Sequence, residues 1–280
     1  MAPLGVLAIV GAVVSVVAFD RRPSRSWRRV AQFAITIASW GVLWFATASA
    51  FSVRAMTSLP LHMIDHVIVM FAVPMGLIGS GAVRDWWWVL GVERRRRVLT
   101  WWYRERRWRV PRVVANPFVA AVAMNTAMVT AHVPGVFDFV MDRQWAMDWL
   151  MEPAFLFSGL FFFHYLVAST PRRLHVRLRV QLAMIAVTMI EMVVLAMAMA
   201  IFSRASWYHV TAMSMAGMGN AHAVHMTFAQ QQLAAGVLWI CGDIWAVPLI
   251  VAISRRLVAR DGSLFAALER QVSGSTRSSV

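Results

Sequence analysis

The chain has 280 residues, of which 60% are apolar and only 14% are charged, and its mean hydropathy is +0.62. Soluble domains carry about 25% charged residues, so this composition excludes water-soluble and disordered proteins and predicts an integral membrane protein. The single Cys241 excludes an internal disulfide. All 27 basic residues are arginine, and beside apolar segments arginine indicates membrane topology and anionic lipid headgroups as partners, with no nucleic acid.

Seven apolar segments are long enough to cross a hydrocarbon core of about 30 Å as helices. They cover residues 2–19, 30–51, 61–83, 113–133, 149–169, 180–203 and 232–253. The first lacks the basic leader and the cleavage site of a signal peptide, so we expect it to be a retained span. The sequence therefore predicts an all-α, seven-transmembrane helix bundle over residues 1–253, followed by a cytoplasmic polar tail over residues 254–280.

The arginines alternate between the segments that join these spans. The first, third, fifth and last of these segments hold 24 of the 27 arginines, and the other three segments hold 3. Because positive residues are retained on the cytoplasmic side, the N-terminus is predicted outside and the C-terminus inside. This pattern is typical of a multi-pass membrane protein.

The segment between the third and fourth spans mixes aromatic and arginine residues. Such a mixture can stack on single-stranded nucleic acid, but beside two spans it favours an anchor at the lipid headgroups. The predicted anchor residues are Trp86, Trp87, Trp88, Arg94, Arg95, Arg96, Arg97, Trp101 and Trp102.

Histidines gather at the predicted outer face. His62 and His66 are four residues apart at the start of the third span, so both imidazoles project from one helix face, and His132 ends the fourth span at the same level. Asp65 is suited to orient an imidazole or to act as a further ligand. A single membrane histidine is more often a helix–helix hydrogen-bond partner, but several at one level favour a metal site.

The last outer segment is rich in methionine and histidine. Its candidate ligands are Met218, His222, His225 and Met226, with His209 as an alternative ligand. Thioether and imidazole donors without cysteine suit Cu(I) better than zinc. The sequence therefore predicts copper, with Cu(I) favoured.

Four acidic residues fall in or beside the spans. Asp148 and Glu152 are four residues apart at the outer start of the fifth span, where a cation, a histidine or the helix dipole is the expected company. Glu191 and Asp243 lie near the middle of the sixth and seventh spans. Intramembrane acids indicate proton or cation passage or a polar contact with another subunit, and the sequence leaves these alternatives open.

Several of these stretches resemble one known family. Residues 61–79 (LHMIDHVIVMFAVPMGLIG) are similar to the His-Met-x-x-His segment, followed by Pro and Gly, of the bacterial CtaG-type cytochrome c oxidase assembly proteins. Residues 131–134 (AHVP), 155–163 (FLFSGLFFF) and 231–239 (QQLAAGVLW) are similar as well. Together the resemblance covers most of the chain from about residue 30 onward, and it implies the bacterial plasma membrane as the location.

The resemblance implies a non-enzymatic role in maturing a haem-copper oxidase, with copper supplied to the CuB centre and an oxidase or other respiratory-complex subunit as partner. It implies His62, His66 and His132 as ligands. The chain departs from the family at Asp148 and Glu152, where members often carry a second His-x-x-x-His, and at Gln230, where an acid is usual. The copper site is then reduced, rebuilt around His222, His225 and the methionines, or lost.

Two alternatives remain open from the sequence. One is a structural or accessory subunit of a respiratory membrane complex that binds no metal. The other is a haem-binding electron-transfer protein, which is disfavoured because two histidines four residues apart on one helix cannot clamp a porphyrin from both sides.

Overall fold

A computed structural model describes residues 2–21, 26–105, 116–167, 176, 178–208 and 227–263. Within these ranges the chain is all-helical and contains no strand. Six helical segments are long and apolar enough to cross a membrane, and a bent pair of helices raises the number to seven if the pair forms one span. An all-α membrane bundle is therefore confirmed, with six or seven crossings.

The first three spans follow the apolar segments of the sequence closely. Helix α1 is Pro3–Asp20 and α2 is Trp27–Ala48. The third span, Leu59–Ser80, consists of α4 (Leu59–Val67), a π-helical turn η1 (Ile68–Ala72) and α5 (Val73–Ser80). Each of these spans is shifted by up to about three residues from its predicted range, because hydropathy locates an apolar core better than the ends of a helix.

The fourth predicted span, residues 113–133, is followed by a sharp bend in the chain. Its helix α9 (Pro117–His132) bends by 77° into α10 (Pro134–Met141). Pro134 has no N–H for the helical ladder and favours extended backbone at the residue before it, and Val133 has φ −64° and ψ 123°. Helix α9 therefore lies within the predicted span, and the chain bends at residue 133, where that span was predicted to end.

The last three spans again lie near their predicted ranges. The fifth, Gln144–Val167, joins α11 (Gln144–Ala146), a π-helical turn η2 (Met147–Met151) and α12 (Glu152–Val167). The sixth joins α13 (Leu178–Met197) and η3 (Ala198–Phe202). The seventh is α14 (Phe228–Asp261), which starts at the cap of Thr227 and continues past residue 253, where the span was predicted to end.

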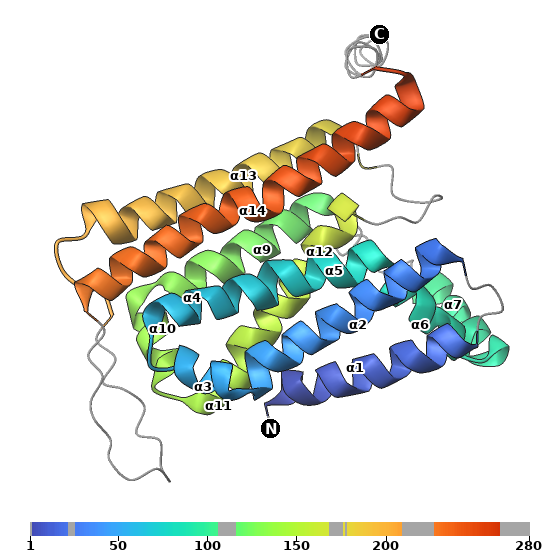
Figure 1. The fold of residues 1–280 in the computed structure, drawn as a ribbon, viewed down its shortest axis with the longest axis horizontal. Coiled ribbons are helices and arrows are strands. Elements are labelled where there is room, and N and C mark those ends of the chain that lie inside the picture. Colours follow the sequence, from blue (N-terminus) through green and yellow to red (C-terminus); the bar gives the residue numbers. More distant parts are fainter. Residues whose placement is uncertain are drawn as a thin grey trace.

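Short helices lie at the two ends of the bundle (Figure 1). Helices α10, α11 and α3 (Ala50–Ala55) lie at the end where α4 begins, while α6 (Ala82–Val89) and α7 (Val92–Glu105) lie at the opposite end. Helices α13 and α14 run side by side along one edge of the bundle. The end with α4 and α10 is the predicted outer end, and the end with α7 is the predicted cytoplasmic end.

The third and fifth spans approach each other closely at a glycine. A Cβ on Gly159 of α12 would overlap the carbonyl of Met70 in η1 and would lie 2.8 Å from Cγ of Pro74 in α5. Only glycine allows two helices to approach this closely, and small residues at helix contacts are typical of membrane bundles. This contact fixes α12 against the span that carries His62 and His66.

One predicted interface anchor, Trp86, makes contacts within the bundle. The indole of Trp86 stacks on Trp40 at 5.3 Å between ring centroids, and its Nε1 donates to Oγ of Ser15 at 3.0 Å. A ring with both an aromatic neighbour and an internal hydrogen-bond acceptor is satisfied by protein alone. Trp86, which is half-buried, therefore ties α6 to the first two spans, and its role as a headgroup anchor stays a prediction.

Candidate functional site

Three histidines from two spans meet at the predicted outer end of the bundle. His62 and His66 lie on α4, whose first turn is set by Pro60, and His132 ends α9 just before the bend. All three side chains are buried, with His62 fully so. Hydropathy and spacing predicted this level for each histidine, and the packing of α4 with α9 brings them into one cluster.

The three imidazole rings form a chain of contacts. The ring centroids of His62 and His66 are 4.2 Å apart, and those of His66 and His132 are 6.1 Å apart. The edge of Phe155 from α12 contacts His66 at 4.7 Å. The rings are therefore close to one another within an aromatic wall and away from solvent.

Most of the ring nitrogens in this cluster lack hydrogen bonds. Both nitrogens of His62 and both of His66 are buried without a hydrogen-bond partner among the described residues. Nδ1 of His132 contacts the Met128 carbonyl at 2.6 Å, which orients that ring. Buried polar atoms are nearly always paired, so four free imidazole nitrogens in one place are a feature that needs a ligand or proton-sharing partner.

A methionine belongs to the same cluster. Sδ of Met63 lies 3.2 Å from Nε2 of His132, and the Met63 side chain is buried. The sequence interpretation did not single out this residue, although it occupies the second position of the His-Met-x-x-His stretch. The sequence predicts that Met63 lies in the third span, but it does not predict that the side chain contacts His132 on another span.

Buried carboxyl groups accompany the imidazoles. Asp65 and Glu152 are both buried, and Oδ1 of Asp65 and Oε2 of Glu152 have no hydrogen-bond partner within the described ranges. Asp65 and Asp148 lie close enough to Glu152 to act on it electrostatically. Two ionised carboxylates in so apolar a setting need a proton or a cation between them.

The π-helical turn η2 separates Asp148 from Glu152. Asp148 lies within η2 and is half-buried, whereas Glu152 begins α12 and is buried. A π turn widens the helix and shifts the register of the residues that follow it, and such turns are frequent at functional sites. Glu152 is therefore more deeply buried than Asp148, although the two acids are only four residues apart.

Aromatic rings close the cluster on its outer side. Phe137 on α10 contacts His62 at 5.4 Å between ring centroids, and Tyr208 lies against Phe137 at 4.0 Å. The Tyr208 hydroxyl donates to the His132 carbonyl at 3.4 Å, and burial raises the pKa of this phenol, which keeps it protonated as a donor. The sequence interpretation missed both rings, since their role depends on the bend that folds α10 back.

The glutamine stretch at the start of α14 positions the aromatic rings that cover the cluster. The backbone N–H of Trp207 donates to Oε1 of Gln231 at 2.7 Å, and Nε2 of Gln231 donates to the Met199 carbonyl at 2.8 Å. The buried amide of Gln231 thus joins the end of the sixth span to the start of the seventh. It holds Tyr208 near His132 and takes no part in the cluster itself.

An apolar groove of about 610 Å³ lies beside the cluster, between α9, α10 and α12. Its walls include Ala131, the neighbour of His132, and Phe155, whose ring contacts His66. The groove and the cluster therefore share the side chain of Phe155.

The other predicted site residues lie elsewhere. The candidates of the last outer segment, His209, Met218, His222, His225 and Met226, fall outside the described residues. Glu191 on α13 is half-buried, with both carboxyl oxygens unpaired among the described residues, whereas Asp243 on α14 is exposed. Neither intramembrane acid belongs to the imidazole cluster.

In the part of the chain that the structure describes, no three His, Cys, Asp or Glu side chains form a ready-made metal site. The cluster instead combines imidazoles with the thioether of Met63, a mixed donor set that suits a soft ion. The four unpaired nitrogens of His62 and His66 fit such an ion.

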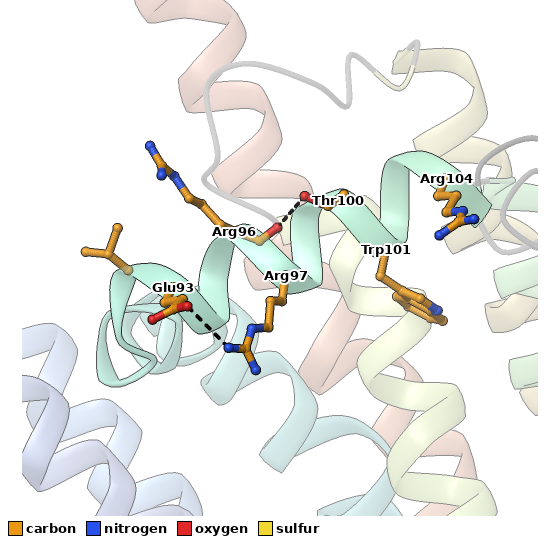
Figure 2. A pocket seen from close by; sticks show the side chains of 7 residues that line it. Glu93, Arg96, Arg97, Thr100, Trp101 and Arg104 are labelled. Atoms are coloured by element: carbon orange, nitrogen blue, oxygen red, sulfur yellow. Dashed lines mark hydrogen bonds and ion pairs between the residues drawn. The ribbon is translucent and has the colours of Figure 1, made fainter.

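An arginine-rich surface lies at the opposite end of the bundle (Figure 2). On α7, a hollow of about 630 Å³ is lined by Val92, Glu93, Arg96, Arg97, Thr100, Trp101 and Arg104. Arg97 pairs with Glu93 at 3.2 Å, whereas Arg96 and Arg104 have no ion-pair partner among the described side chains. Val92 and Trp101 are 69% and 60% exposed, so α7 presents both arginine and apolar side chains to its surroundings.

The comparison with protein families decides between the classes considered for this bundle. A family model described as cytochrome c oxidase caa3 assembly factor (Caa3_CtaG) matches residues 12–260. The chain belongs to this family. No curated protein and no solved structure is detectably similar to the chain. Membership agrees with a multi-pass membrane protein that assists oxidase assembly, and it favours a non-catalytic role.

Proposed function

We propose that this assembly factor holds Cu(I) at the imidazole cluster of His62, His66 and His132 and passes it to the CuB centre of its client oxidase. The observation that carries the proposal is the set of four buried, unpaired ring nitrogens on His62 and His66. In an apolar setting such nitrogens are costly unless they bind a ligand. Membership of the oxidase assembly-factor family supports copper as that ligand.

The donor set suits transfer better than storage. Neutral imidazoles and the Met63 thioether are soft enough donors for Cu(I), and the buried carboxyl groups of Asp65 and Glu152 are available to balance its single positive charge. Transfer to an all-imidazole acceptor proceeds by ligand exchange, in which each metal–ligand bond broken at this site is replaced by one formed at the acceptor, and no oxidation or reduction is needed. Copper is cargo in this proposal and not a resident cofactor.

We also propose how the chain sits in the membrane. The imidazole cluster faces the outside, and the arginines of α7 contact anionic headgroups on the cytoplasmic side. The exposed Val92 and Trp101 support this arrangement, because apolar and cationic side chains on one short helix are typical of an interfacial helix.

Copper binding is tested on the full-length chain in lipid nanodiscs. Cu(I) is titrated without oxygen against a chromogenic Cu(I) chelator, for the wild type and for the double variant His62→Ala, His66→Ala. We expect the variant to lose affinity by about a hundredfold, since metal sites weaken ten- to a hundredfold even when only a supporting partner is removed.

His164→Ala is the matched control, because His164 is a half-buried histidine on α12 outside the cluster. The control variant should bind Cu(I) like the wild type. Equal and negligible copper in all three proteins contradicts the proposal and leaves an accessory subunit that binds no metal.

A further inference from the structure

The seventh span carries a carboxyl group on its outward face. Asp243 is exposed, and it has no hydrogen-bond or ion-pair partner among the residues that the structure describes. Its neighbours on the same face, Ile240, Ile244 and Val247, are 60%, 65% and 54% exposed. Buried residues such as Trp245 and Leu249 lie on the opposite face and pack into the bundle. The acid therefore points away from the protein, among apolar side chains.

Asp243 also lies near mid-depth of the membrane. The apolar part of α14 runs over Phe228–Arg255. At about 1.5 Å per residue, the acid is roughly 22 Å from one end and 18 Å from the other. An aspartate side chain is too short to reach the headgroups over that distance, so lipid phosphate and water do not solvate it. An unpartnered acid at this depth is costly, and such acids mark contacts or pathways.

The same face carries a glycine, Gly236, that no packing contact within the described part of the chain requires. Gly236 lies two helical turns before Asp243, and a Cβ at this position would meet nothing within 4 Å in the described part of the chain. Glycine inside a helix is less favourable than alanine. Small residues on a membrane-facing surface allow the backbone of another helix to approach closely.

We propose that this outward face of α14, defined by Gly236, Ile240, Asp243 and Val247, docks a transmembrane helix of another protein that carries a cationic residue at mid-depth. Charge complementarity identifies the occupant. A guanidinium or ammonium group that pairs with the Asp243 carboxylate lowers the free-energy cost of both charges in the bilayer. The approach of the two helices is closest at Gly236.

A second copy of the chain does not fit this face equally well. In the described spans arginine occurs only near the ends, at Arg28, Arg29, Arg179 and Arg255. A symmetric partner would therefore oppose Asp243 with apolar side chains or with another Asp243. The inference does not depend on copper, because the docking face and the imidazole cluster involve different side chains.

The test uses defined probes with the full-length chain in neutral lipid vesicles. The probes are synthetic transmembrane peptides of leucine and alanine, one with a central arginine and one with leucine at that position. Association is measured by resonance energy transfer between the labelled protein and the labelled peptide. We expect the arginine peptide to bind the wild type about tenfold more tightly than the leucine peptide.

Three variants make the test specific. Asp243→Leu should abolish the preference for the arginine peptide, and Asp243→Glu should retain it. Val187→Leu, at an exposed position on α13, should leave it unchanged. Circular dichroism checks that each variant is folded, and Asp243→Asn replaces Asp243→Leu if the latter is not.

Several results would overturn the proposal. Equal binding of the two peptides by the wild type would do so, as would a preference that persists without the carboxylate. Self-association of the wild type that is lost in Asp243→Leu would assign the face to a second copy instead.

Discussion

At the scale of single residues, the imidazole cluster depends on a few side chains whose environment differs from that of ordinary core residues. His62 and His66 are buried with free ring nitrogens, whereas the buried Thr36 and Ser15 each form hydrogen bonds within the bundle. The ring nitrogens of the two histidines thus lack hydrogen bonds, whereas the hydroxyl groups of Thr36 and Ser15 have them. This difference supports the proposal that the histidines bind a ligand and do not merely pack.

Met63 gives the sharpest residue-scale prediction. Met63→Leu keeps the volume of the side chain but removes the sulfur atom that lies 3.2 Å from Nε2 of His132. We expect Cu(I) affinity to fall on the order of tenfold while the melting temperature changes little. Chelator competition measures the affinity, and circular dichroism measures the melting.

Met184→Leu is the control for this substitution, because Met184 is a buried methionine on α13 away from the cluster. An equal loss of affinity in both variants would mean that thioether ligation at Met63 plays no special part.

At the scale of helices, position in the bundle decides what each amphipathic segment does. Helices α6 and α7 follow each other in the sequence, and both contain tryptophan and arginine. The indole of Trp86 on α6 is held by Trp40 and Ser15, whereas Trp101 on α7 is exposed. Aromatic residues next to arginine therefore predict proximity to the membrane surface, but not which of them face lipid.

Helix α7 should select anionic lipid. Replacing Arg96 and Arg104 by glutamine removes two cations without an ion-pair partner among the described residues, and each cation near a charged membrane contributes about 1 kcal/mol. The preference for spin-labelled phosphatidylglycerol over phosphatidylcholine should fall about fivefold per arginine and should weaken with salt. Electron paramagnetic resonance of the reconstituted chain measures this preference.

Arg97→Gln serves as the control, since the Arg97 guanidinium already pairs with Glu93 at 3.2 Å. Its effect should be smaller than that of either other arginine. A drop of the same size, or one that salt does not alter, would contradict specific headgroup binding.

At the scale of the whole molecule, the sequence predicted the spans well and the contacts between them poorly. About 20 apolar residues in a row have few structures available in a bilayer other than a spanning helix, so hydropathy located most of the spans. The contact of Met63 with His132 joins residues from different helices, and periodicity along one helix cannot identify its neighbour. Helix α10 was missed for a related reason, because it is short and lies in a predicted outer segment.

The candidate site was predictable to the same extent. The sequence predicted that six histidines lie at the outer face of the membrane, and three of them meet in the described structure. Phe137 and Tyr208 gave no signal in the sequence, since aromatic residues are common throughout this chain, and Phe155 belonged to a stretch that resembles the family but was not singled out. Their role follows from the bend at Val133, which a sequence pattern marks with Pro134 but does not orient.

The orientation of the molecule is open to a direct test. The arginine distribution predicts that α11 is outside and α7 inside. Trp145 and Val92 are exposed at 54% and 69%. Trp145→Cys should therefore react with a membrane-impermeant maleimide in intact cells, whereas Val92→Cys should react only after the membrane is opened. The buried native Cys241 supplies little background, and the reverse labelling pattern would invert the topology.

The bend between α9 and α10 has a mechanical consequence. Gly159 brings the fifth span into close contact with the third, and a larger side chain there would push these two helices apart. Phe137, which covers His62, instead lies on the short arm beyond Val133, where Pro134 has already interrupted the helical ladder. A movement of α10 would therefore uncover His62 without breaking the backbone hydrogen bonds of a spanning helix.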